Sequence, residues 1–247
     1  MSGGGVSMKW TALISYVAMV VVNILASTVG INGKKTNEIS DQVDVLFVPA
    51  GYVFSIWGLI YVLLAIWLIL QFRSSQTHEE PARMGLFVMT CLFNIAWLLS
   101  WHYGFYTSSI VIMIGLLVSI IFLYESYSKG DAHFSGRLPF SIYLGWISVA
   151  LMANISFVLK YYGWDGFGFL EPFWAQVLLI LATVLAAFIR IYKQDIFFSF
   201  VVIWALIGIA VKNGIEAGAL FYMPIIYSIF LLIWIFIGRG ITKQQSM

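Results

Sequence analysis

The chain has 247 residues, of which 62% are hydrophobic and only 10% are charged, and its formal net charge is +2. A soluble domain carries about a quarter charged residues, so this chain cannot cover itself with polar surface, and we expect it to lie in a lipid bilayer. The small net charge argues against a nucleic-acid partner. A single cysteine, Cys91, excludes a disulfide framework within one chain.

The hydrophobic stretches predict an all-α, polytopic transmembrane helix bundle with about eight spans. The predicted spans are residues 10–30, 52–72, 84–101, 107–124, 138–159, 173–191, 196–211 and 217–237. The first is interpreted as a retained helix, because its apolar run is longer than the core of a cleaved signal peptide. The seventh is the weakest, since it reaches only roughly 24 Å, and seven spans is the alternative.

Basic residues are distributed unequally between the two sides that these spans define. Nine fall on the side of the N-terminus: Lys9, Arg73, Arg83, Lys129, Arg137, Arg190, Lys193, Arg239 and Lys243. Four fall on the other side: Lys34, Lys35, Lys160 and Lys212. By the positive-inside rule this bias predicts that both termini are cytoplasmic. We expect an integral, multi-pass protein of the plasma membrane of a bacterium.

The second span carries a wide aromatic face. Pro49 suits a helix entrance because it has no N–H to lose. Phe54, Trp57 and Tyr61 follow at spacings that place them on one side of a helix. Such a face either packs against neighbouring helices or lines a pocket for a flat ligand, and the sequence leaves both interpretations open.

Two further spans place an asparagine beside aromatic residues. Asn94, Trp97 and Trp101 share one face of the third span, and Trp146, Ala150 and Asn154 recur every four residues in the fifth. An asparagine within a bilayer requires a hydrogen-bond partner, so each is either a contact between helices or a ligand contact. We expect Asn154 to pair with Asn94 or with a backbone carbonyl.

The loops and the last third of the chain give weaker signals. Residues 31–49 are expected to form a solvated loop, in which Ser40 and Asp41 cap a short helix. Lys212 and Glu216 are expected to pair at the membrane surface, and Pro224 to kink the eighth span. The three histidines are scattered, so no metal site is predicted. The sequence contains neither an acid–base pair at membrane depth nor a glycine-rich phosphate loop, so it gives no sign of an enzyme active site.

Three of these segments resemble the TspO/MBR family, the tryptophan-rich sensory proteins related to the mitochondrial translocator protein. The entry to the second helix of that family, P-x-x-x-F-x-x-x-W-x-x-x-Y, is similar to Pro49, Phe54 (one residue late), Trp57 and Tyr61. The N-x-x-W of its third helix is similar to Asn94 and Trp97. The Pro-Tyr, Trp, Ala and Asn of its fifth helix are similar to Pro139, Phe140, Trp146, Ala150 and Asn154, with Phe140 in place of Tyr.

The resemblance implies a TspO-like five-helix core over residues 1–160 and additional transmembrane helices over residues 161–247, which make this a longer, divergent member. It implies binding of a flat hydrophobic ligand such as a porphyrin, with no required cofactor, and a possible homodimer. The implied ligand-binding residues are Phe54, Trp57, Tyr61, Asn94, Trp97, Trp146, Ala150 and Asn154. The alternatives are a transporter of a small hydrophobic solute and a porphyrin-degrading enzyme.

Overall fold

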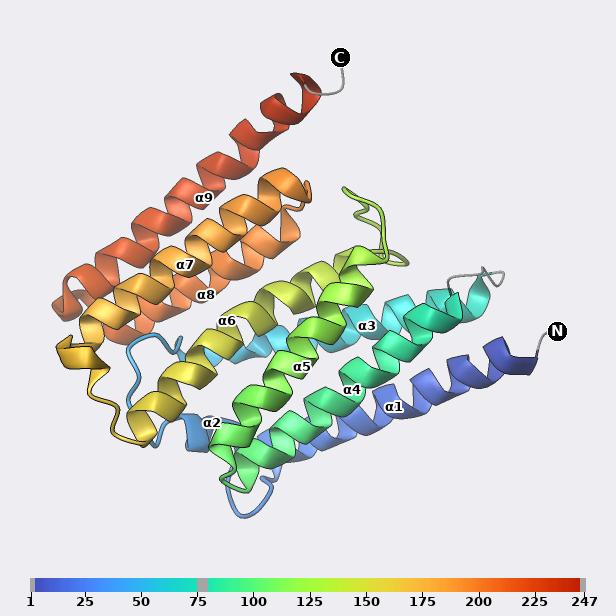
Figure 1. The fold of residues 1–247 in the computed structure, drawn as a ribbon, viewed down its shortest axis with the longest axis horizontal. Coiled ribbons are helices and arrows are strands. Elements are labelled where there is room, and N and C mark those ends of the chain that lie inside the picture. Colours follow the sequence, from blue (N-terminus) through green and yellow to red (C-terminus); the bar gives the residue numbers. More distant parts are fainter. Residues whose placement is uncertain (1–2, 75–79, 245–247) are drawn as a thin grey trace.

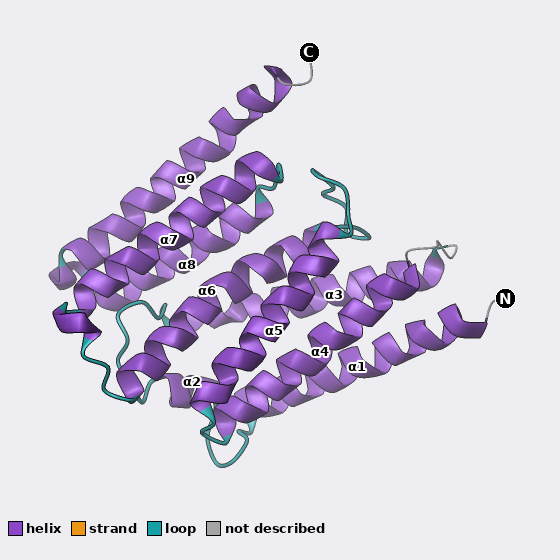
Figure 2. Cartoon of the chain, viewed as in Figure 1, coloured by secondary structure: helices purple, strands orange, loops and turns teal. Residues whose placement is uncertain are grey.

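The computed structural model describes residues 3–74 and 80–244, and its regular elements in these ranges are helices joined by loops and turns (Figures 1 and 2). The α-helices are α1 (Gly3–Thr28), α2 (Thr36–Ser40), α3 (Ile56–Arg73), α4 (Glu80–His102), α5 (Tyr106–Glu125), α6 (Leu138–Tyr161), α7 (Glu171–Tyr192), α8 (Phe197–Asn213) and α9 (Ala219–Gln244). Short 3₁₀ helices are η1 (Gly51–Ser55), η2 (Gly166–Gly168) and η3 (Ile215–Ala217). The predicted all-helical membrane fold is therefore confirmed.

The long helices alternate in direction, so that the start of α1 and the end of α9 lie at the same end of the bundle, at the right and at the top of Figure 1 respectively. This end is called the terminal end here, and the opposite one the distal end. Seven of the described helices are long and apolar enough to cross a membrane, and α8 is the shorter apolar helix between two of them. Helix α8 carries the chain from the terminal end back to the distal end but is only about 25 Å long, so seven helices have the length of a span and α8 is the shorter eighth.

The helices fall into two groups that share an interface. Helices α1, α3, α4, α5 and α6 form a five-helix bundle, and α7, α8 and α9 form a second group beside it (Figure 1). Helix α8 packs along α6 of the first group and against α7 and α9 of the second. Many of its side chains are buried, so α8 is mainly a core helix. This explains why a short helix is tolerated, since little of its surface has to match the lipid.

The polar groups of the five-helix bundle are paired in a way that the sequence did not predict. The Asn94 side chain accepts a hydrogen bond from Asn23 of α1 (2.8 Å) and donates one to the Tyr143 hydroxyl of α6 (2.9 Å). Asn154 pairs with Ser109 of α5 at 3.1 Å, so the expected pairing with Asn94 or with a backbone carbonyl is wrong. Each asparagine joins separate helices, as expected for buried amides in a membrane protein.

At the terminal end, a polar cluster with buried Arg137 and Asp195 at its centre fastens α7 and α8 to the five-helix bundle. The Arg137 guanidinium lies 3.6 Å from the centroid of the Tyr124 ring and donates to the Lys193 carbonyl at 3.2 Å. The Tyr124 hydroxyl donates to Asp195 (2.8 Å), whose carboxylate also accepts from the first backbone N–H groups of α8. Lys193 pairs with Glu125 at 2.6 Å. This cluster is called the terminal junction.

Residues 31–49 are not simply the solvated loop that was expected. Val45, Phe47 and Val48 are buried, because the segment folds back over the distal ends of the helices. The expected short helix is present as α2, with Ser40 as its last residue and Asp41 as its C-cap, so these residues end the helix. The segment then enters α3 through the 3₁₀ turn η1 rather than directly through an α-helix.

Two expectations for the C-terminal part concern α8 and α9. Lys212 does not pair with Glu216; it donates to the Val45 carbonyl at 3.0 Å and lies 3.5 Å from the Asp44 carboxylate. The local pairing failed because the buried loop offers Lys212 an acceptor from far away in the chain. Helix α9 continues through Pro224, and the hydroxyl of Ser228, one turn further along the helix, donates back to the Pro224 carbonyl.

Candidate functional site

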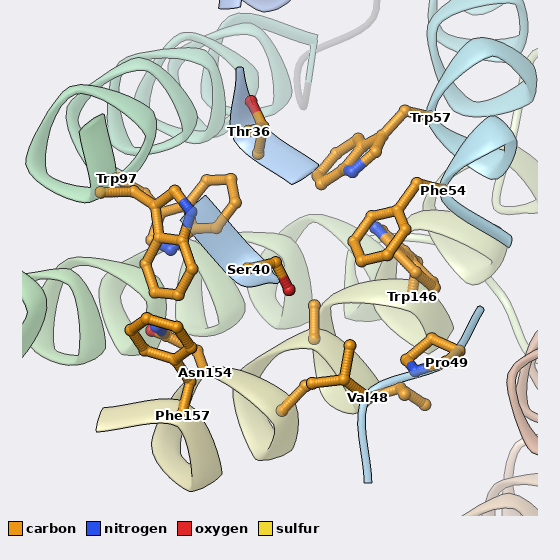
Figure 3. A pocket seen from close by; sticks show the side chains of 14 residues that line it. Thr36, Ser40, Val48, Pro49, Phe54, Trp57, Trp97, Trp146, Asn154 and Phe157 are labelled. Atoms are coloured by element: carbon orange, nitrogen blue, oxygen red, sulfur yellow. The ribbon is translucent and has the colours of Figure 1, made fainter. Parts of the chain in front are cut away.

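A cavity of about 60 Å³ lies toward the distal end of the five-helix bundle (Figure 3). Helices α4 and α6, the α3 entrance and the segment 36–49 enclose it. Its lining residues are Thr36, Ser40, Val48, Pro49, Phe54, Trp57, Trp97, Trp101, Trp146, Val149, Ala150, Ala153, Asn154 and Phe157. The lining contains no ionisable side chain, and six of its fourteen residues are aromatic. The cavity therefore suits an apolar molecule with flat faces.

Trp57 is the centre of the aromatic contacts around this cavity. Its ring is nearly parallel to the Trp97 ring, at 6.5 Å between centroids and 27° between planes. It meets the Trp146 ring edge-on at 6.1 Å and 86°, and Phe54 meets the same Trp146 ring edge-on at 5.7 Å. In Figure 3, Trp57, Phe54 and Trp146 lie on one side of the space, opposite Trp97 and Phe157. The walls present both ring faces and ring edges, which are the two geometries in which an aromatic ligand can pack.

Three indole N–H groups of the lining are left without a partner. The Nε1 atoms of Trp97, Trp101 and Trp146 are buried and find no hydrogen-bond partner among the described residues. The three side chains belong to residues that are at most 8% exposed. A buried donor without an acceptor costs about 1–3 kcal/mol, so such groups are rarely left unpaired without a reason. All three belong to the lining of the same cavity.

Six of the eight residues predicted for the ligand site line the cavity: Phe54, Trp57, Trp97, Trp146, Ala150 and Asn154. Tyr61 and Asn94 do not belong to its lining. Tyr61 stacks behind Trp57 at 5.7 Å, and its backbone carbonyl accepts a hydrogen bond from Tyr16. Asn94 is fully buried, and its amide is used by Asn23 and Tyr143. These two residues support the cavity wall from behind.

Sequence reasoning missed several lining residues. Trp101 shares a face with Asn94 and Trp97 but was not among the implied ligand-binding residues. Phe157 follows Asn154 at a helical spacing of three, so the same-face argument could have included both. Thr36, Ser40 and Val48 gave no such signal, because they belong to the loop that folds over the cavity. Among residues 3–74 and 80–244, no group of three His, Cys, Asp or Glu side chains could hold a metal ion.

The fold and the cavity define the class of this protein, a multi-pass helical membrane protein with an internal aromatic cavity. The family model described as TSPO-like protein matches residues 9–237, and the chain therefore belongs to the TSPO-like family. The match extends beyond the five-helix core of residues 1–160 that the resemblance implied, and includes α7, α8 and most of α9. No curated protein and no solved structure matches the chain significantly.

Proposed function

We propose that the protein is a membrane binding or sensory protein that holds a flat hydrophobic ligand, such as a porphyrin, in the aromatic cavity. The observation that carries this proposal is the gathering of three unpaired indole donors in a lining that contains no charged side chain. Ring faces would stack on the ligand, and the indole N–H groups would bind its acceptor oxygens. Porphyrins with carboxylate groups combine both features.

The size of the cavity adds a condition to this proposal. Pockets that enclose drug-sized ligands have volumes of about 300–1,000 Å³. The present cavity of about 60 Å³ is much smaller. A tetrapyrrole therefore requires that part of the wall moves outward, and a smaller flat molecule requires less movement. We infer that the structure represents the closed, ligand-free state of the site.

The test is a titration of the purified protein with protoporphyrin IX in detergent, followed by quenching of tryptophan fluorescence. We expect saturable quenching at micromolar ligand. Trp146→Leu should weaken binding about tenfold, because it removes one ring contact and one donor, together worth about 1.4 kcal/mol. Trp10→Leu is the matched control, since Trp10 is exposed on α1 far from the cavity and its loss removes the same fluorophore.

The result that contradicts the proposal is quenching that does not saturate and that is equal in the wild type and in both variants. The aromatic residues would then serve packing alone. Flux of a small hydrophobic solute into vesicles, dependent on Pro224 or Lys212, would instead support the transporter alternative. Light-dependent bleaching of the porphyrin, lost in Trp146→Leu and absent in detergent alone, would support the enzyme alternative.

The orientation and the assembly are also proposals. The nine basic residues counted toward the N-terminal side fall at the terminal end of the bundle, and the other four fall at the distal end. This supports cytoplasmic termini in a bacterial plasma membrane by the positive-inside rule. Labelling of single cysteines at positions 34 and 129 from outside intact cells would test the orientation. The family resemblance supports a homodimer, which the mass of the protein in detergent would test.

A further inference from the structure

We propose that helices α6, α7 and α8 regulate access to the aromatic cavity by latching its lid. The lid is the segment of residues 36–49, and the latch is formed by Lys160, Glu171, Lys212 and Asn213. The proposal rests on the proposed function in one respect, since it takes the cavity to be the ligand site. The latch assigns a role to the helices beyond residue 161 that the five-helix core does not require.

The lid is the movable part of the cavity wall. Thr36, Ser40, Val48 and Pro49 line the cavity from the lid, and the other lining residues belong to η1 and the membrane helices α3, α4 and α6. Those helices are held in place by packing within the bundle. The buried Asn94 amide, for example, joins α4 to α1 and to α6. A ligand larger than about 60 Å³ can be admitted with the least rearrangement if the lid moves outward.

Three consecutive carbonyls of the lid accept hydrogen bonds from outside it. Lys160, at the end of α6, donates to the Asp44 carbonyl. Lys212 and Asn213, at the end of α8, donate to the carbonyls of Val45 and Leu46, each at 3.0 Å.

The first residue of α7 completes the latch. The Glu171 carboxylate accepts from the Leu46 N–H at 3.0 Å and pairs with Lys160 at 2.5 Å. Three helices therefore hold one short stretch of lid backbone. Because nearly all of these contacts go to backbone atoms, the latch depends on the side chains of the helices rather than on those of the lid.

The latch can be released without unfolding the bundle. The side chains of Lys160, Glu171 and Lys212 are 39%, 34% and 26% exposed, and water can replace their contacts.

The lid is also attached at both ends. Thr36 contacts the His102 ring at 3.0 Å, and beyond the lid the Ala50 N–H donates to the Gly208 carbonyl at 3.0 Å.

The second attachment needs a glycine. A Cβ atom at position 208 would lie 2.2 Å from Val53, so only glycine allows α8 to approach η1 this closely. A segment fixed at both ends and latched in the middle can bulge outward over the cavity and return to the same place.

The decisive experiment measures how often the lid opens, without any ligand. Ala153 lines the cavity, and Ala153→Cys in a Cys91→Ala background places a single thiol there. The rate of its reaction with a water-soluble maleimide reports lid opening. The combined variant Lys212→Met and Asn213→Ala removes two latch donors and should raise this labelling rate about tenfold. This is the effect expected from the loss of two hydrogen bonds, one of which comes from an exposed cation.

Lys193→Met is the matched control. The Lys193 side chain is as exposed as that of Lys212, and its replacement also removes an ion pair, but at the terminal end. Its labelling rate should stay within twofold of the reference. Equal labelling of the latch variant and the reference would overturn the proposal. Amide hydrogen exchange of residues 36–49 in the chain that keeps Cys91 is the second readout. There, faster exchange in the latch variant alone supports the latch, and unchanged exchange overturns it.

The same variants distinguish the latch from the proposed function. If protoporphyrin IX binds, the latch variant should accelerate both its association and its dissociation, with a dissociation constant that changes less than either rate. Bound porphyrin whose rates are unchanged would overturn the latch while the binding function stands. If protoporphyrin IX does not bind at all, the proposed ligand fails, and thiol labelling and hydrogen exchange still decide whether the latch exists.

Discussion

The two ends of the interface between the five-helix bundle and the C-terminal helices are built differently. At the terminal end, Arg137 and Asp195 are only 2% and 6% exposed, and they pair with an aromatic ring, a tyrosine hydroxyl and backbone groups. At the distal end, the latch uses lysine and glutamate side chains that reach into water, and the Asp44 side chain is 85% exposed.

The difference in burial has a physical consequence. Breaking a buried polar contact leaves a desolvated group without a partner, whereas water takes the place of an exposed contact. The terminal junction is therefore a permanent attachment, and the distal latch is a reversible one. The same helices can remain anchored at one end while they release the lid at the other.

The largest effect is expected from breaking the terminal junction. Asp195→Ala removes the cap of α8 and leaves the buried Tyr124 hydroxyl without its acceptor. The free energy of unfolding should fall by about 2–4 kcal/mol, the sum of a lost cap and an unpaired buried hydroxyl. Thermal unfolding in detergent measures the change. Asp195→Asn keeps an acceptor oxygen and should lose less; an equal loss in both variants would contradict the capping argument.

A smaller effect is expected from Tyr127, which lies beyond the end of α5 at the terminal end. Its hydroxyl accepts a hydrogen bond from the buried Trp67 indole at 2.8 Å. Tyr127→Phe leaves this indole without a partner and should cost about 1–2 kcal/mol at neutral pH. The double variant Tyr127→Phe and Trp67→Phe should lose less stability than the sum of the two single variants, because either exchange already breaks the hydrogen bond. A loss equal to that sum would show that the bond is unimportant.

Tyr127 also gives the terminal end a pH dependence. Burial raises the pKa of Tyr127 to about 12, although the Trp67 hydrogen bond and the nearby Arg83 cation act to lower it. The folded state thus keeps the phenol proton that the unfolded chain loses near pH 10, and stability should fall between pH 10 and about 12. The difference between the stabilities of the wild type and Tyr127→Phe, measured across this range, isolates the contribution of Tyr127 from that of the lysines.

The smallest effect on stability is expected at the distal latch. Lys160→Met removes the contacts to the Asp44 carbonyl and to Glu171, both at the water-exposed surface. The free energy of unfolding should change by less than about 1 kcal/mol. A loss as large as that of Asp195→Ala would erase the distinction between a permanent and a reversible attachment.

The sequence predicted much of the fold because membrane helices are specified locally. Long apolar runs gave the helices, and the alternation of the predicted spans gave the end of the bundle at which each loop lies. Six of the predicted site residues reached the cavity because their spacing already places them on inward faces of α3, α4 and α6. Helical periodicity is a property of neighbours in the chain and can be read from the sequence.

The partners of polar groups were not predicted, because they come from distant parts of the chain. Asn154 had a nearby serine on α5, and Lys212 found the lid backbone rather than Glu216. Tyr61 and Asn94 carried the right residue types at the right spacing, yet they lie outside the cavity lining. Whether a residue on an inward face meets another helix or an open space depends on how closely the helices approach.

The sequence by itself determined that this chain crosses a membrane as a helical bundle and that three of its helices present aromatic faces inward. Tertiary structure alone decided that residues 36–49 cover the cavity between those faces and that α6, α7 and α8 hold this cover in place. The physical reason is that burial of apolar residues acts along each segment, whereas hydrogen bonds to a loop backbone depend on where folding brings the donors.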